Sequence, residues 1–128
     1  MPNAGGTLFI ASGPTGDHLF VIAFEPRHIE EYGSSEQVLL VPICTVYPGG
    51  KHDPACIVQA GEHSFVVHES YLDYRWSRIE SVNHIRDRIG EGAFKEHAPV
   101  TEVLLQRVLH GLSQTKRMPR HIKDDFKL

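Results

Sequence analysis

Hydrophobic residues form short continuous runs in the first half of the chain and occur at helical spacing in the second half. The runs at 18–24 (HLFVIAF) and 38–46 (VLLVPICTV) are rich in β-branched and aromatic residues, which predicts two buried strands. Shorter runs predict strands at 8–12, 55–60 and 63–68, and alternation across 71–79 predicts one more. Glycine and proline predict turns at 13–16 and 47–54, and the polar segment 27–37 predicts an exposed loop.

Helical spacing begins after residue 81. Apolar residues at 82, 85 and 89 predict a helix over 82–89, with Gly90 and Gly92 as stop signals. Pro99 suits the first turn of a second helix, which reaches Gly111-Leu112. One apolar stripe marks that helix, formed by Val100, Val103, Leu104, Val108 and Leu112.

The order of these elements predicts the fold class. Short strands followed by helices indicate a mainly β protein with helices (α+β), built as a small antiparallel barrel or a strongly bent sheet that the helices cover on one side. We expect one domain over residues 1–113. Residues 114–128 predict a basic, flexible tail, in which Ile122 and Phe126 are the side chains suited to docking.

The composition is that of a folded globular protein. The chain has 128 residues, 41% of them hydrophobic and 23% charged. No run approaches the roughly 18 apolar residues that span a bilayer, and the N-terminus lacks the basic start of a secretory signal. We therefore expect a cytoplasmic protein whose Cys44 and Cys56 are reduced.

Charge is distributed unevenly along the sequence. Residues 1–70 hold two basic and eight acidic residues, whereas residues 71–128 hold eleven basic and eight acidic ones, so the halves carry −6 and +3 and sum to −3. A basic face of this kind is the minimum footprint for nucleic acid. A solvated basic helix and tail is the other interpretation.

The segment 63–78 (HSFVVHESYLDYRWSR) concentrates groups that suit RNA. Aromatic side chains stack on unpaired bases, and arginine matches phosphate oxygens bidentately. Packing in the core is the alternative role for the aromatic residues. The predicted nucleic-acid-binding residues are Tyr71, Asp73, Trp76, Arg78, Lys116 and Arg117.

Metal-free RNA cleavage needs a base, a cation for the charge on phosphorus, and an acid. Histidine suits the first and third roles, because its ordinary pKa is about 6.5. The predicted catalytic residues are Thr45 as a donor, Arg27 and Arg75 as phosphate clamps, and His63 as acid or base, with His28 and His68 as further histidines.

A zinc site is the rival interpretation. Cys44, His52, Asp53, Cys56 and His63 are all credible zinc ligands, although they lack CxxC or HExxH spacing. We favour a turn role for His52-Asp53, and we predict no cofactor.

The order of short motifs resembles the Kid/PemK/MazF toxins over residues 16–112. Gly16-Asp17 precedes a strand that ends at Phe24-Glu25-Pro26, and the next strand ends in Cys44-Thr45. Glu69, Leu72-Asp73 and then Arg75 or Arg78 follow in the family's order, and a helix closes with Gly111-Leu112.

The resemblance implies an SH3-like barrel with helical additions, a homodimer, and metal-independent cleavage of single-stranded RNA that an antitoxin partner neutralises. It places Thr45 at the family's hydroxyl position. Glu36-Gln37 stands where the family has an Arg-Pro pair. The alternative is therefore a non-catalytic module that binds nucleic acid or peptide on the same barrel.

Overall fold

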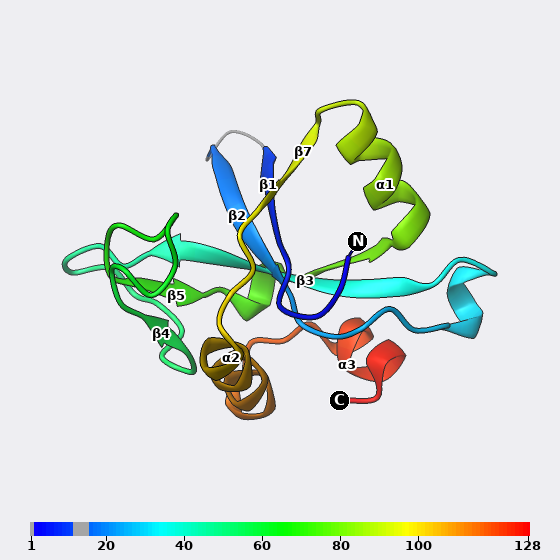
Figure 1. Cartoon of the computed structure of the whole chain (residues 1–128). Coiled ribbons are helices and arrows are strands. Elements are labelled where there is room, and N and C mark those ends of the chain that lie inside the picture. Colours follow the sequence, from blue (N-terminus) through cyan, green and yellow to red (C-terminus); the bar gives the residue numbers. More distant parts are fainter. Residues whose placement is uncertain (1, 12–15) are drawn as a thin grey trace.

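A computed structural model describes residues 2–11 and 16–128 of the chain. It is a mixed α+β protein with an open antiparallel sheet of seven strands, in the order β4-β5-β3-β2-β1-β7, with β6 also paired to β3 (Figure 1). The strands are β1 (Thr7–Ala11), β2 (Asp17–Ile22), β3 (Gln37–Thr45), β4 (Ile57–Val58), β5 (Ser70–Leu72), β6 (Arg78–Ser81) and β7 (Phe94–His97). The α+β class predicted from the sequence is confirmed.

Strand β3 is the centre of the sheet, because it pairs with β2 along one side and with two shorter strands along the other. Its first half faces β6, with Leu40 opposite Arg78, and its second half faces β5, with Thr45 opposite Ser70. A 3-10 helix, η3 (Tyr74–Trp76), separates β5 from β6. The single strand predicted over 71–79 is therefore wrong, since the chain turns there and sends Tyr74 into the core.

Both faces of the sheet are covered. Leu19, Val21 and Ala23 of the β2 segment face the larger core, which includes side chains of α2 (Glu102–Gln114) and α3 (Arg120–Phe126). Phe20 and Ile22 face a second core beneath α1 (Val82–Gly90) on the other side (Figure 1). This double burial explains the continuous apolar runs and confirms that 18–24 and 38–46 contain buried strands.

The two predicted helices are present, but one starts later than expected. In α1 the Ser81 hydroxyl accepts a hydrogen bond from the His84 N–H at the N-terminus. In α2 Thr101 caps the start by accepting from the Leu104 N–H. Pro99 therefore precedes the helix and does not lie in its first turn.

The C-terminal segment is folded onto the larger core, so the expectation of a flexible tail is wrong. Met118, Ile122 and Phe126 are buried there, and the Phe126 ring stacks on that of Phe24 at 6.0 Å between centroids. Docking by Ile122 and Phe126, which the sequence suggested, is confirmed. Hydrophobic spacing over a seven-residue helix is too short a signal to separate docking from disorder.

Residues 59–69 form a loop of turns between β4 and β5, called here the 59–69 loop, so the strand predicted at 63–68 is wrong. The Arg107 guanidinium of α2 binds Glu62 of this loop and the Ile57 carbonyl. Strand β7, which pairs with β1, was not predicted. Residues 13–15 of the predicted turn and Ser12 of the first predicted strand lie outside the described residues.

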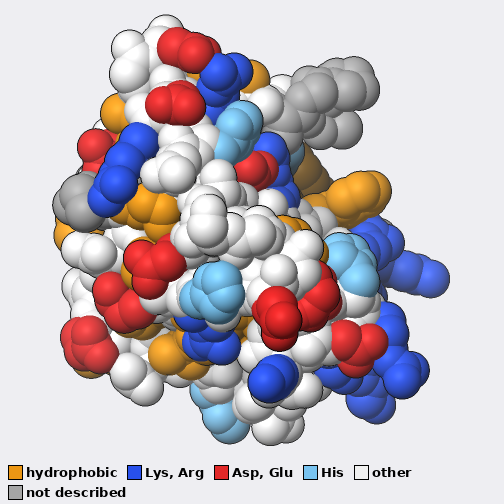
Figure 2. All heavy atoms as spheres, turned by 90° about the vertical axis from the view of Figure 1, so that its right-hand side faces the viewer, with side chains coloured by type: hydrophobic (Ala, Val, Ile, Leu, Met, Phe, Trp, Pro, Cys, Tyr) orange, Lys and Arg blue, Asp and Glu red, His pale blue; other side chains and the backbone are white. Residues whose placement is uncertain are grey.

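No helix in the described part of the chain is long and apolar enough to cross a membrane. Figure 2 shows several Lys and Arg side chains gathered along one edge of the face that carries α1 and α3.

Candidate functional site

A groove of about 1060 Å³ runs between β2, β3, β5, η3 and the 59–69 loop. Within the described residues, seven large hydrophobic side chains are exposed, and four of them line this groove: Tyr47, Phe65, Val67 and Trp76. Tyr47 is 70% exposed and Trp76 is 63% exposed. Exposed apolar side chains that gather on one surface mark a site of interaction.

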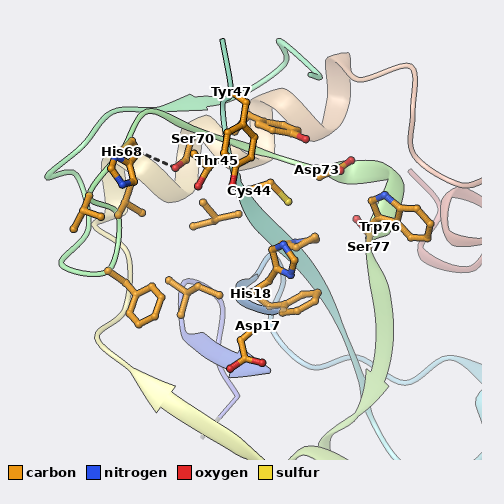
Figure 3. Close-up of a pocket in the computed structure, with 18 of the residues that line it drawn as sticks. Asp17, His18, Cys44, Thr45, Tyr47, His68, Ser70, Asp73, Trp76 and Ser77 are labelled. Carbon is orange, nitrogen blue, oxygen red and sulfur yellow. Dashed lines mark hydrogen bonds between the residues drawn. The ribbon is translucent and has the colours of Figure 1, made fainter. Parts of the chain in front are cut away.

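Polar side chains lie among these apolar ones. Figure 3 shows Thr45, Ser70 and His68 together at one end of the groove, Trp76 and Ser77 at the other, and His18 between them. The strand register places Thr45 opposite Ser70, whose hydroxyl donates to the His68 carbonyl at 2.8 Å. No described group hydrogen-bonds to the hydroxyl of Thr45, which is among the residues that line the groove.

Asp73 carries the most unusual group of the groove. Its side chain is 4% exposed, and its Oδ1 has no hydrogen-bond partner among the described residues. Burial raises the pKa of this carboxyl, while the Arg75 charge, a backbone hydrogen bond from Arg75 and the Arg117 charge oppose the rise. A buried carboxylate with an unsatisfied oxygen is costly, and such groups concentrate at functional sites.

The pKa values of two neighbours of Asp73, Cys44 and Tyr71, are also raised. Burial raises the pKa of the Cys44 thiol to about 11, and the Asp73 charge adds to the rise. The thiol is therefore neutral near pH 7, where only a thiolate is a strong nucleophile. Burial likewise raises the pKa of Tyr71, whose ring lies 5.3 Å from that of His52 between centroids.

Of the basic residues predicted from the sequence, Arg78 lines the groove, and Arg75, Lys116 and Arg117 lie outside its wall. Arg78 lines the groove, and its Nε donates to the Glu80 carboxylate at 3.0 Å. Arg75 is exposed beside the groove, with its guanidinium 5.4 Å from the centre of the Trp76 ring. Lys116 and Arg117 are exposed in the connection between α2 and α3, outside the groove wall.

Arg27, predicted as a phosphate clamp, does not line the groove. It donates to the Phe126 carbonyl at 3.3 Å, and its guanidinium lies 4.6 Å from the centre of the Phe24 ring. These contacts hold the end of α3 against the sheet. The phosphate-clamp role predicted for Arg27 is therefore not one that this groove can use.

His63 is also structural. Its Nδ1 accepts from the Phe65 N–H at 3.0 Å, so Nε2 carries the proton and donates to the Ala98 carbonyl at 2.6 Å. The ring is buried and does not line the groove, although Phe65 does. The acid–base role predicted for His63 is therefore not one that this groove can use, and the residue holds the 59–69 loop to the segment before α2.

The residues of the zinc interpretation are not gathered into a site. Across residues 2–11 and 16–128, no group of three or more His, Cys, Asp and Glu could hold a metal ion. Asp53 accepts from the Ala55 N–H at 3.0 Å and from the Thr115 hydroxyl at 2.5 Å. Cys56 is buried against Gly111 of α2.

Several groove residues were missed by sequence reasoning. Asp17 and His18 begin β2, and Tyr47, Phe65 and Val67 lie in turns or loops. His18 stands at the first position of a predicted buried strand, where a polar residue is a weak sign of an exposed end. No local pattern distinguishes the apolar residues of the 59–69 loop from strand residues.

Comparisons with known proteins add no assignment. No protein-family model matches the chain, and no curated protein matches it either.

Proposed function

We propose that this chain is a toxin-type, metal-independent endoribonuclease that binds single-stranded RNA in the groove. The observation that carries the proposal is the placement of Asp73, buried and with an unsatisfied oxygen, in a groove lined by four exposed apolar side chains. Such a groove offers surfaces for bases and one carboxyl that has an unsatisfied oxygen. The resemblance to the Kid/PemK/MazF toxins supports the same function.

Binding rests on the aromatic groups. Tyr47 and Trp76 project from different elements and bound the groove near Thr45 and Ser77 respectively (Figure 3). Each unpaired base that stacks on such a ring contributes about 1–3 kcal/mol. Stacking of this kind tolerates any base, and it selects single strands because duplex bases are already stacked.

The proposed reaction is attack of a ribose 2′-oxygen on the adjacent phosphorus. Asp73 takes the 2′-hydroxyl proton, a 2′,3′-cyclic phosphate forms, and the bond from phosphorus to the 5′-oxygen breaks. His18, which faces the middle of the groove, gives its proton to the leaving 5′-oxygen. The Thr45 hydroxyl and the Arg78 guanidinium donate to the phosphate oxygens as negative charge develops.

Several features of the resemblance belong to the proposal as well. We propose that the bent sheet corresponds to the SH3-like barrel, that the active unit is a homodimer, and that a partner antitoxin neutralises it. The pairing of β3 with β5 and β6 on either side of η3 supports a strongly bent sheet.

The test is cleavage of a long single-stranded RNA in the presence of EDTA. Asp73→Asn and Thr45→Val are compared with the native chain, and Asp87→Asn on the exposed face of α1 is the matched control. We expect cleavage by the native chain and the control, and its loss in Asp73→Asn. Folded native protein that leaves the RNA intact would overturn the enzymatic proposal, and circular dichroism establishes folding.

A non-catalytic binding module is the second candidate. The observation that favours it is the engagement of Arg78 by Glu80, together with the position of Arg27 outside the groove, which leaves no unpaired arginine among the described residues of the wall. This candidate predicts that RNA binds without cleavage and that Trp76→Ala abolishes binding. Cleavage in EDTA that depends on Asp73 excludes it.

A further inference from the structure

One end of the groove continues onto exposed basic residues from a distant part of the chain. Trp76 lines the groove, and the Arg75 guanidinium lies over its ring at 5.4 Å. Arg75 therefore extends the wall beyond Trp76. Because η3 begins immediately after β5, the position of Arg75 is fixed by the sheet.

Arg117 follows the end of α2, and that end packs against the element that carries Arg75. The Tyr74 hydroxyl of η3 donates to the Val108 carbonyl of α2 at 2.7 Å, and Gly111 lies against the same hydroxyl. Burial raises the pKa of Asp73 and of Tyr71, and the charges of Arg75 and Arg117 oppose both rises. The packing of α2 against η3 thus brings Arg75 and the connection after α2 to the same part of the molecule.

A buried polar contact holds the connection in place. The Thr115 hydroxyl donates to Asp53 at 2.5 Å and accepts from the Arg117 N–H at 3.1 Å. Asp53 is itself held by the Ala55 N–H. The backbone at Lys116 and Arg117 is thus anchored to the turn between β3 and β4, and this contact fixes where the two basic side chains leave the backbone.

These basic side chains differ from several other arginines of the chain in their ionic contacts. In the part of the chain that the structure describes, Arg75, Lys116 and Arg117 form no ion pair, whereas Arg78, Arg88 and Arg107 each pair with a glutamate. Exposed cations outside ion pairs and next to a stacking surface suit a polyanion. A guanidinium also matches phosphate oxygens bidentately.

We propose that Arg75, Lys116 and Arg117 form a phosphate-binding surface that continues the groove past Trp76 and holds the RNA backbone outside the cleavage point. This inference rests on the proposed binding of single-stranded RNA. It assigns to these residues a role in affinity and in the length of RNA bound, separate from the effect of the two arginine charges on the pKa of Asp73.

The experiment measures binding of labelled 2′-O-methyl RNA, which lacks the attacking hydroxyl, as a function of salt. A trinucleotide, which fits the groove, is compared with a dodecanucleotide, which extends past it. The proteins are the native chain, the double variant Lys116→Ala/Arg117→Ala, Arg75→Ala, and Lys95→Ala on β7 as the basic control.

For the dodecanucleotide, the negative slope of log K against log salt should become less steep by about 0.7 for each phosphate that the variant no longer neutralises. The trinucleotide and the Lys95→Ala control should be unaffected. An unchanged slope for the dodecanucleotide overturns this inference alone, provided that Trp76→Ala still weakens binding. Failure of the native chain to bind either oligonucleotide overturns the proposed function too, and tighter binding of a polyglutamate peptide assigns the surface to an acidic partner instead.

Discussion

Two buried aspartates lie in neighbouring parts of this molecule, and they differ in how their oxygens are used. Asp53 is 3% exposed and accepts hydrogen bonds from Ala55 and Thr115. Asp73 is 4% exposed, yet its Oδ1 has no partner among the described residues. The two carboxyl groups are therefore equally buried, but only that of Asp53 recovers the cost of burial through hydrogen bonds to both oxygens.

The difference in hydrogen bonding assigns a structural role to Asp53 and a role on a ligand to Asp73. Asp53 ties the turn after β3 to the end of α2, and its hydrogen bonds offset the cost of removing the group from water. Asp73 gains no such compensation at Oδ1, and burial raises its pKa. A protein retains a costly group of this kind where the group acts on a ligand, so the comparison predicts opposite responses to mutation.

The largest expected effect is on cleavage. Asp73→Asn should reduce the rate of RNA cleavage by about 10²–10⁴-fold, the usual contribution of a general base. Asp53→Asn should retain the rate of the native chain per folded molecule. Rates from gel-resolved time courses check both, and equal losses in the two variants would contradict the separation of roles.

For the free energy of unfolding, we expect the larger effect from substitution of Asp53 and the smaller one from substitution of Asp73. Asp53→Ala should lower the free energy of unfolding by about 1–3 kcal/mol, because it leaves the Thr115 hydroxyl and the Ala55 N–H without their acceptor. Asp73→Asn should cause no loss, since it removes a buried charge with an unsatisfied oxygen. Urea denaturation near pH 7 measures both values. A large loss of stability in Asp73→Asn would show that this carboxylate is structural.

A substitution at Gly111 tests how closely α2 packs against Tyr74 and the segment before β4. A Cβ at this position would lie 2.5 Å from the Tyr74 hydroxyl and 2.9 Å from the Ala55 carbonyl oxygen. Gly111→Ala should therefore destabilise the protein by about 1–2 kcal/mol, because overpacking outweighs the gain of about 1 kcal/mol in helix propensity. Leu109→Ala, on the same helix, is a control for general loss of α2 packing. A stabilised Gly111→Ala would contradict the close approach of α2 to β4.

The smallest expected effect is a pH dependence of stability. The pKa of Asp73 is raised from its ordinary value of 3.8, so its contribution to stability is complete below that value and is lost as pH rises through the folded-state pKa. The stability of Asp73→Asn relative to the native chain should therefore increase as pH rises above 3.8. Urea midpoints measured across this range check the direction, and a constant difference would mean that burial does not perturb the group.

Much of the scaffold could be predicted from local pattern. The buried runs at 18–24 and 38–46 identified β2 and β3, and the spacing of Val82, Ile85 and Ile89 identified α1. Thr45 and Trp76, which the sequence singled out for catalysis and for RNA binding, both line the groove, although core packing was an open alternative for the aromatic residue. The break at Asp73 was missed, because three residues of a 3-10 helix are too few for their sequence pattern to be distinguished from the alternation of a strand.

The sequence by itself determined which segments are apolar enough to be buried and which residue types are available for RNA chemistry. Tertiary structure alone decided that His63 and Arg27 hold segments together, and that Asp73 has no partner at Oδ1 among the described residues. It also decided that the end of α2, ahead of Arg117, packs against Tyr74, which follows Asp73. The physical reason is that hydrogen-bond satisfaction, desolvation and charge proximity depend on contacts between distant segments, whereas periodicity reports only which face of a local element is buried.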